Sequence, residues 1–310
     1  MQVYLVTGAA GFVGSHICEE LLTNTNNIVI GIDNFYSGNK DTIDFLRKES
    51  DSFIFYELDI RQHDEISKVI QEHNVKYIFH EAAIASVQIS VENPLFTNDV
   101  NIKGSLSVLE AARKNDVKRF IFASSAAVFG DEPTLPKNEK SITKPISPYG
   151  LEKLIIEQYM ELYSEQYGLE CIALRYFNVY GPRQDPHSEY SGVISIFDNR
   201  IKQDLPVKIY GDGEQYRDFI YVKDIVDINI TLMHSHLKNK FSIFCAGSSV
   251  KTTINELVKI LFEKYNKPIY FEEIRARDGD IRGSVADNKE LNKYLKNYLF
   301  SDLVKSISSI

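Results

Sequence analysis

A tyrosine and a lysine lie four residues apart at positions 149 and 153, in a segment that begins with helix-start signals. Ser147 can cap a helix and Pro148 suits its first position, so Tyr149 and Lys153 are predicted to share one helix face, about one turn apart. Tyrosine has a reference pKa of about 10, and one neighbouring cation lowers the pKa of an acid by about 1 to 3 units. Tyr149 can therefore act as a base near neutral pH only if further positive charge or hydrogen bonds assist Lys153.

A run of small side chains follows residues 120–123, an apolar stretch typical of a buried strand. This run, Ser124, Ser125 and Ala126, lies at the carboxyl end of the predicted strand. Ligands bind at the carboxyl ends of strands in open α/β sheets. We expect Ser125 to hydrogen-bond the oxygen at which the chemistry occurs. A lone Tyr-x-x-x-Lys is common by chance and would by itself indicate a solvated helix, so the catalytic interpretation depends on a second motif.

That second motif is the glycine-rich segment 7–14, which follows an apolar stretch and leads into a helix-like pattern. Gly8, Gly11 and Gly14 permit a tight turn, let the backbone approach a pyrophosphate, and let helix and strand pack closely. Asp33 ends the next predicted strand about 20 residues later, where a carboxylate binds ribose hydroxyls and repels a 2′-phosphate. The combination predicts a dinucleotide site and favours NAD over NADP. Asp59 and Ile60, after the third strand, either meet the adenine edge or form an ordinary turn.

The elements that must position these residues alternate between β-rich and helical patterns through the first half of the chain. Strands are predicted at residues 3–6, 28–32, 53–56, 77–80 and 120–123, with amphipathic helices such as 65–72 and 105–113 between them. The alternation predicts an α/β fold with a Rossmann-type doubly wound parallel sheet. We expect residues 1–175 to form an NAD-binding domain, to which part of 215–245 returns. Residues 176–310, with a helix at 257–265, should form mainly a smaller mixed α/β substrate domain.

Composition narrows the class of protein. A net charge of −8 disfavours nucleic-acid binding and requires local basic residues to hold any anionic ligand. No apolar run approaches the roughly 20 residues that cross a membrane, and no secretory leader pattern is present, so we expect a cytoplasmic protein. Cys18, Cys171 and Cys245 stand singly among apolar neighbours without metal-ligand spacing, which predicts buried thiols and no metal site.

The chain resembles the extended short-chain dehydrogenase/reductase family over nearly its whole length, within the NAD-dependent epimerase/dehydratase group. It is most similar to the UDP-glucose and UDP-N-acetylglucosamine 4-epimerases. The resemblance rests on segments 7–14, 80–83, 124–130, 175–183, 209–213 and 217–222, on Ser86, Val87 and Ser90, and on Tyr149 with Lys153.

This resemblance implies that Tyr149 takes the C4 hydroxyl proton of a UDP-hexose while the C4 hydride passes to NAD, with Ser125 and Lys153 assisting. The resulting ketone turns over before the hydride returns, which inverts C4. Related 4,6-dehydratases have an acidic pair just after the serine or threonine, where this chain has Ala126 and Ala127. Epimerisation is therefore favoured over dehydration. His80 is expected to be a structural residue of the cofactor cleft.

The resemblance also implies binding residues. Further NAD contacts are expected from Phe12, Val13, Asn34, Ser37, Gly38 and Ala82, beside Tyr149 and Lys153 themselves. Substrate contacts are expected from Ser86, Ser125, Asn178, Val193, Val207, Tyr210, Arg217, Arg277 and Ser284, with the two arginines on the diphosphate. Either arginine taken alone would more simply be a surface ion pair.

Ser284 occupies a position that resembles the family's gatekeeper over the C2 substituent of the sugar. A large tyrosine there restricts relatives to glucose and galactose, whereas a small side chain leaves space for an N-acetyl group, although Ser284 is equally compatible with a simple turn. Segments 181–186 and 190–194 also resemble enzymes that accept N-acetylhexosamines. The sequence thus favours UDP-GlcNAc and UDP-GalNAc, with UDP-Glc and UDP-Gal as an additional pair.

Some positions depart from the family pattern, and some alternatives stay open. Phe129 replaces a tyrosine, and Ala85 stands where some relatives have lysine. A homodimer formed through residues 101–114 and 149–167 is expected from the resemblance, although both segments can also face their own core. The alternatives are another C4-oxidising enzyme, such as a UDP-uronate epimerase or decarboxylase or a 4-keto reductase, and a noncatalytic NAD-sensing module.

Overall fold

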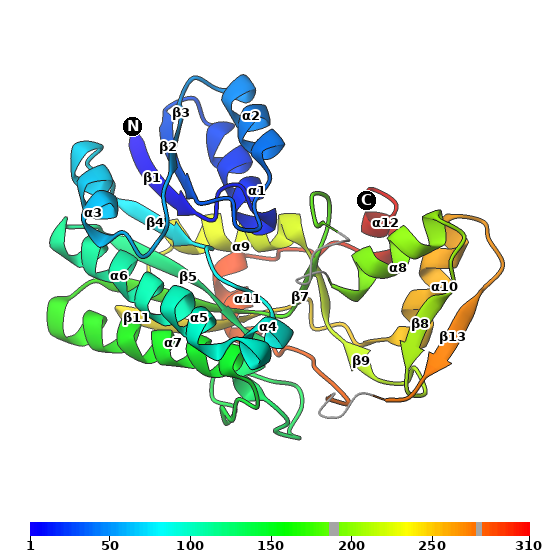
Figure 1. The fold of residues 1–310 in the computed structure, drawn as a ribbon. Coiled ribbons are helices and arrows are strands. Elements are labelled where there is room, and N and C mark those ends of the chain that lie inside the picture. Colours follow the sequence, from blue (N-terminus) through cyan, green and yellow to red (C-terminus); the bar gives the residue numbers. More distant parts are fainter. Residues whose placement is uncertain (186–191, 277–280) are drawn as a thin grey trace.

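The structure is a computed structural model that describes residues 1–185, 192–276 and 281–310. Its centre is a seven-stranded sheet in which all neighbouring strands are parallel (Figure 1). In spatial order the strands are β11 (Phe241–Ala246), β6 (Glu170–Tyr176), β5 (Arg119–Ser125), β4 (Tyr77–His80), β1 (Gln2–Thr7), β2 (Asn27–Asp33) and β3 (Phe53–Glu57). The order 3-2-1-4-5-6 within it is that of a doubly wound dinucleotide fold, so the predicted fold class is confirmed.

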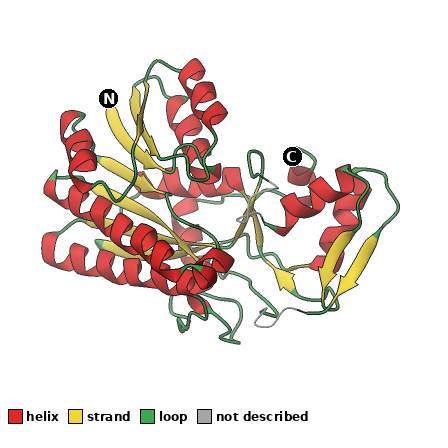
Figure 2. Ribbon diagram, in the orientation of Figure 1, coloured by secondary structure: helices red, strands yellow, loops and turns green. Residues whose placement is uncertain are grey.

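Helices cover both faces of this sheet (Figure 2). Apolar side chains of one face pack against α1 (Phe12–Leu22), α2 (Lys40–Glu49), α9 (Val222–His234) and α11 (Lys289–Leu295). Those of the other face pack against α3 (His63–Glu72), α6 (Ser105–Lys114) and α7 (Pro148–Tyr167). Because both faces are covered, β1 and β5 are buried along almost their whole length, which explains their continuous apolar sequences.

Short elements lie over the amino-terminal half of α7. They are α4 (Val87–Glu92), α5 (Pro94–Asn98) and a π-helical turn, η1 (Asp99–Gly104), which leads into α6. A further short 3₁₀ turn, η2 (Ala126–Phe129), follows β5 directly. The predicted helical region 101–114 is therefore two segments with different hydrogen-bond patterns.

A smaller lobe has its own apolar core and mixed secondary structure (Figure 1). Its elements are α8 (Val193–Lys202), β8 (Val207–Tyr210), β9 (Tyr216–Arg217), β12 (Thr252–Thr253), α10 (Ile254–Lys264), β13 (Phe271–Ile274) and α12 (Leu303–Ile307). Strand β8 pairs with β13 in parallel, and β9 pairs with β12 in antiparallel fashion. The parallel pair β7 (Asn178–Tyr180) and β10 (Phe219–Tyr221) lies between the lobes.

The chain crosses between the lobes several times. After β10 it returns to the larger lobe as α9 and β11, passes back as β12 and α10, and returns again as α11. All three cysteines are free and buried, as expected for small apolar side chains. None of the helices within the described residues has the length and apolar character needed to cross a membrane.

Candidate active site

A cleft of about 1000 Å³ opens at the carboxyl ends of the central strands. This cleft is lined by every residue that the sequence predicted to contact the cofactor or to catalyse, and all of these residues belong to the larger lobe. They are Gly8, Gly11, Phe12, Val13, Gly14, Asp33, Asn34, Ser37, Gly38, Asp59, Ile60, Ala82, Ser125, Tyr149 and Lys153. One cavity therefore gathers motifs that are spread over 146 residues of sequence.

The glycine turn at its floor is too tight for side chains. A Cβ on Gly14 would lie 2.2 Å from the carbonyl oxygen of Gly8. Gly8 itself has φ +72°, and a Cβ there would lie 2.9 Å from the backbone nitrogen of Ala82. Gly11 caps α1 without a side-chain hydrogen bond, and the first turn of α1 carries no acidic residue. A bare helix start with close backbone approach fits the pyrophosphate of a dinucleotide.

Asp33 lies at the end of β2, where the ribose of a dinucleotide is expected. Its Oδ2 accepts from the Ala10 amide at 3.0 Å and its Oδ1 from the Phe35 amide at 2.8 Å. Burial raises the pKa of this carboxyl, although the backbone hydrogen bonds oppose the shift. A Cβ on Gly38 would lie 2.9 Å from Oδ1, so the next turn also needs its glycine to pass this close.

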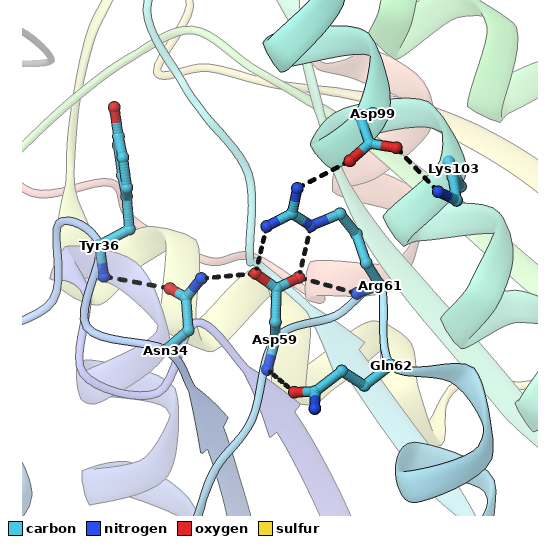
Figure 3. A network of polar contacts seen from close by, with 7 residues as sticks. All are labelled: Asn34, Tyr36, Asp59, Arg61, Gln62, Asp99 and Lys103. Atoms are coloured by element: carbon cyan, nitrogen blue, oxygen red, sulfur yellow. Dashed lines mark hydrogen bonds and ion pairs between the residues drawn. The ribbon is translucent and has the colours of Figure 1, made fainter.

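The outer end of the cleft is organised by a network of polar contacts around Asp59 (Figure 3). Arg61 binds the Asp59 carboxylate through two nitrogens, at 2.9 and 2.8 Å, and reaches Asp99 of η1 at 2.7 Å. Asn34 donates to the same carboxylate at 2.9 Å, and Lys103 pairs with Asp99 at 3.0 Å. The hydrogen bonds from Arg61 lower the pKa of Asp59 to about 2, so a fixed anion lies beside the predicted adenine position.

The side chains of Tyr149 and Lys153 meet in the cleft as their spacing predicts. Ser147 caps α7 by accepting from the Gly150 amide at 3.1 Å, and Pro148 is the first helical residue. The Lys153 ammonium lies 5.7 Å from the centre of the Tyr149 ring and donates to the carbonyl of Ala123 at 2.7 Å. The geometry places a phenol, an ammonium and the end of β5 around one point.

The electrostatics of this group leave the phenol protonated in the protein alone. Burial raises the pKa of Tyr149 to about 12, while a hydrogen bond with Ser125 acts in the opposite direction. Burial also lowers the pKa of Lys153 to about 8. Ionising Tyr149 near neutral pH therefore needs a further positive charge, which agrees with the expectation that Lys153 alone is insufficient.

Buried polar contacts hold α7 against the sheet at this point. One turn beyond Lys153, Glu157 accepts from Ser124 at 2.5 Å and from Arg175 of β6 at 3.0 and 2.7 Å. On the other side of the helix, Glu152 accepts from Thr97 at 2.6 Å and from Asn101 at 2.7 Å. These contacts fix the helix in rotation and therefore fix where Tyr149 and Lys153 point.

His80 is a structural residue in this arrangement. Its ring nitrogens bond Thr7 at 2.7 Å and Ser105 at 2.9 Å, and burial lowers its pKa to about 3. A fully buried, neutral imidazole with both nitrogens engaged is not available as a base.

Several residues that line the cleft were not assigned a role from the sequence, among them Glu81, Tyr176 and Arg183. Glu81 and Tyr176 face each other with a hydrogen bond of 3.0 Å, and Arg183 contacts both His16 and Glu19. Glu81 lies within the segment 80–83, so an acidic residue at a strand end was the signal that could have identified it. Arg183 has φ +65°, a conformation that sequence patterns do not reveal for arginine.

Among the described residues that were predicted to hold a UDP-sugar, only Ser125 lines this cleft, although Asn178 lies between two lining residues, Phe177 and Val179. Ser86 is buried and caps α4 by accepting from the Ile89 amide at 3.1 Å, and Ser284 is 8% exposed. Arg217 donates to the carbonyls of Tyr216 and Ile281, at 3.0 and 2.9 Å. The others belong to three separate elements: Asn178 to β7, Val193 to α8, and Val207 and Tyr210 to β8. Arg277 lies outside the described residues.

The fold and the cleft define a dinucleotide-binding protein of the Rossmann type in which a tyrosine and a lysine of one helix line the same cleft as the glycine turn. The model of the NAD dependent epimerase/dehydratase family matches residues 4–245. The chain therefore belongs to the NAD-dependent epimerase/dehydratase family, and NAD is its cofactor.

Its relatives act on several nucleotide sugars. A putative UDP-glucose 4-epimerase of Methanocaldococcus jannaschii is 43% identical over 83% of this chain and 80% of its own. A UDP-glucuronate 4-epimerase of Thermodesulfobacterium geofontis is 31% identical over 95% of this chain and 90% of its own. A UDP-N-acetylglucosamine 4-epimerase of Methanobrevibacter ruminantium has been solved in complex with UDP-N-acetylmuramic acid. It is 36% identical and superposes with a TM-score of 0.92, covering 99% of this chain and 96% of its own. Epimerisation at C4 is common to all three descriptions, whereas the sugar differs.

Proposed function

We propose that this chain is a 4-epimerase of UDP-hexoses that interconverts UDP-GlcNAc and UDP-GalNAc, with UDP-Glc and UDP-Gal as a second pair. The observation that carries the proposal is the meeting of Ser125, Tyr149 and Lys153 in the same cleft as the glycine turn. The 4-epimerase relatives support the reaction, and the small Ser284 supports the acetamido sugar.

In this mechanism the protein positions the sugar C4 hydroxyl between Ser125 and Tyr149. The phenolate of Tyr149 accepts the hydroxyl proton, the Lys153 ammonium stabilises that phenolate, and Ser125 holds the oxygen as it becomes a carbonyl. The glycine turn and Asp33 would hold NAD, which when bound would supply reversible acceptance of the C4 hydride. After the 4-keto sugar turns over, Tyr149 gives the proton back to the oxygen and C4 is inverted.

Elimination of water from the sugar is disfavoured by the residues next to Ser125. Dehydration needs an acid and a base beside C5 and C6, and η2 begins with Ala126 and Ala127, which cannot transfer protons. The same site therefore has the groups for reversible oxidation at C4 but lacks ionisable side chains at the two positions that follow Ser125.

The proposal is tested by NMR of the purified protein with UDP-GlcNAc, UDP-Glc and UDP-glucuronate in separate tubes, following the anomeric and H4 signals without added reductant. Conversion of UDP-GlcNAc to UDP-GalNAc is the expected result. Conversion of UDP-Glc alone would retain the reaction and overturn the choice of sugar, as would conversion of the uronate alone. No conversion in any tube by NAD-loaded protein would overturn the proposed reaction.

A further inference from the structure

Glu81 is a cleft residue to which the mechanism above gives no role. It follows β4 directly, and its amide donates to the carbonyl of Thr7 at 3.3 Å, so it is held at the carboxyl end of the sheet beside β1. The residue is partly buried and lines the same cavity as Tyr149 and Lys153. An acidic side chain in this place must either be compensated or act on the charges around it.

The carboxylate is fixed from the far side of the cleft. Tyr176 of β6 donates its hydroxyl to Oε1 of Glu81 at 3.0 Å, and Asn229 of α9 donates to that hydroxyl at 2.7 Å. Asn229 is itself held by the carbonyl of Ile225 at 2.8 Å. Within the described residues, Glu81 has no ion-pair partner within 4.0 Å, and its Oε2 accepts no hydrogen bond. A chain of neutral donors thus holds an acid without neutralising it.

Glu81 lies beside the carbonyl that Lys153 bonds. His80 of β4 pairs with Phe122 of β5, so the next residues, Glu81 and Ala123, come next to each other at the strand ends, and Lys153 donates to the Ala123 carbonyl at 2.7 Å. Burial lowers the pKa of Lys153, and an ionised Glu81 opposes that shift. Glu152 already accepts two hydrogen bonds, from Thr97 and Asn101, that tie it to α5 and η1. Glu81 has a single side-chain donor and opens on the cleft, so it is the carboxylate better placed to act on the ammonium.

We propose that Glu81 is a positioning residue that maintains the positive charge of Lys153 and so supports the phenolate of Tyr149. The proposal rests on the proposed function of this cleft. It also explains why Tyr176 and Asn229 keep the carboxylate in place from two other elements.

The effect of Glu81 on Lys153 depends on pH, because both groups titrate near neutrality. Burial lowers the pKa of Lys153 to about 8, and an ionised Glu81 opposes that shift. Burial raises the pKa of Glu81 itself to about 7, against the hydrogen bond from Tyr176 and the charge of Lys153. His80 is neutral, since its pKa is lowered to about 3. Glu81 therefore acts on Lys153 above about pH 7 and loses this action as the pH falls through that value.

One effect of Glu81 opposes the proposal. An ionised Glu81 also raises the pKa of Tyr149 directly and so disfavours its phenolate. The proposal requires the gain through Lys153 to exceed this repulsion, and the titration of Tyr149 described below measures which of the two is larger.

The test is Glu81→Gln, which keeps the size and the hydrogen bond with Tyr176 but removes the charge. In the NAD-loaded variant, the alkaline limb of the kcat/KM profile should move to lower pH by about 1 unit, as expected for loss of a nearby opposite charge. Glu81→Asp keeps the charge, so its alkaline limb should move less than that of Glu81→Gln. Glu139→Gln is the matched control, because Glu139 is partly buried but bonds the Cys245 amide at 3.0 Å, away from the cleft lining.

A second measurement does not depend on turnover. The ultraviolet absorbance of ionised Tyr149, obtained by subtracting a Tyr149→Phe protein at each pH, should appear at higher pH in Glu81→Gln than in the parent, both loaded with NAD. If both the alkaline limb and this titration are unchanged in a folded Glu81→Gln protein, the inference is wrong. If the parent converts no UDP-sugar but the titration moves, the proposed function fails and the action of Glu81 on the Tyr149–Lys153 pair stands.

Discussion

In the larger lobe, the cleft residues lie at the ends of neighbouring parallel strands, whereas the described residues beyond position 176 that were expected to hold a UDP-sugar come from several separate segments. The turn after β1, Asp33 at the end of β2 and Ser125 at the end of β5 reach one edge because parallel strands end together. By contrast, Asn178, Val207 and Arg217 belong to three different two-stranded pairs. Strand order alone positions the first set, while long-range packing must position the second.

This difference separates two kinds of function. On the proposed function, cofactor binding and proton transfer use the larger lobe, where local motifs determine geometry. Selection of the sugar is proposed to depend mainly on the smaller lobe, where each residue is placed by its own packing. Substitutions in the larger lobe should therefore affect every substrate alike, and those in the smaller lobe should change the ratio between substrates.

The largest effect is expected from Tyr149→Phe. Removing the hydroxyl that accepts the substrate proton should lower kcat by about 10²- to 10⁴-fold, with every UDP-sugar alike and with NAD still bound. Turnover is followed by NMR and bound NAD by absorbance after denaturation. Tyr163→Phe, on the same helix but bonded to Glu110 at 3.0 Å, is the control and should retain activity. Retained turnover in Tyr149→Phe would show that another group is the base.

Gly14→Ala should weaken cofactor binding next most strongly. Its Cβ would lie 2.2 Å from the Gly8 oxygen, so the turn must open, at a strain of about 1 to 3 kcal/mol that corresponds to about 5- to 150-fold in affinity. Calorimetric titration with NAD measures the loss. At Gly11 the nearest contact of a Cβ is 3.2 Å, so Gly11→Ala should lose less. Equal losses would mean that close backbone packing at Gly14 does not set the affinity.

The sequence predicted the elements of the larger lobe better than those of the smaller lobe. All five predicted strands are present and extend by no more than one or two residues at an end, because buried parallel strands carry continuous apolar runs. Strands β9 and β12 have two residues each, too few for any periodicity, and their pairing depends on Arg217 and Thr252 meeting across the lobe. The roles of Glu157 and Glu81 were not predicted, since each depends on a partner from another element, Arg175 and Tyr176 of β6.

A smaller and more selective effect is expected from Ser284→Tyr. If Ser284 leaves space for the N-acetyl group, the larger side chain should lower kcat/KM for UDP-GlcNAc relative to UDP-Glc by about 10-fold or more. Ser284 is 8% exposed and its amide bonds the carbonyl of Tyr216 at 3.2 Å, so the variant must first be shown to fold. Ser284→Ala, which adds no volume, should keep the parental ratio. An unchanged ratio in a folded Ser284→Tyr protein would remove Ser284 from substrate selection.

The smallest effect is expected at the network around Asp59, where the larger lobe meets solvent (Figure 3). Arg61→Gln removes the paired contact with Asp59, which is partly exposed, so the free energy of unfolding should fall by less than about 1 kcal/mol in urea at neutral pH. The pKa of Asp59 is lowered to about 2 in the folded protein, below its reference of about 3.9, so its contribution is present above that reference and is lost as the pH falls through about 2.

The free energies of unfolding of variant and parent should therefore converge between about pH 4 and pH 2. In this range the parent loses the contribution of its Arg61–Asp59 pair, which the variant lacks at every pH. Lys103→Gln is the control, because Lys103 is 70% exposed and, among the residues that the structure describes, forms an ion pair only with Asp99, at 3.0 Å. A constant difference between Arg61→Gln and the parent across this range would mean that Arg61 stabilises the cleft through packing of its aliphatic chain. In that case the anion beside the adenine position would be held chiefly by Asn34 and the backbone, and Arg61→Gln should leave NAD affinity unchanged.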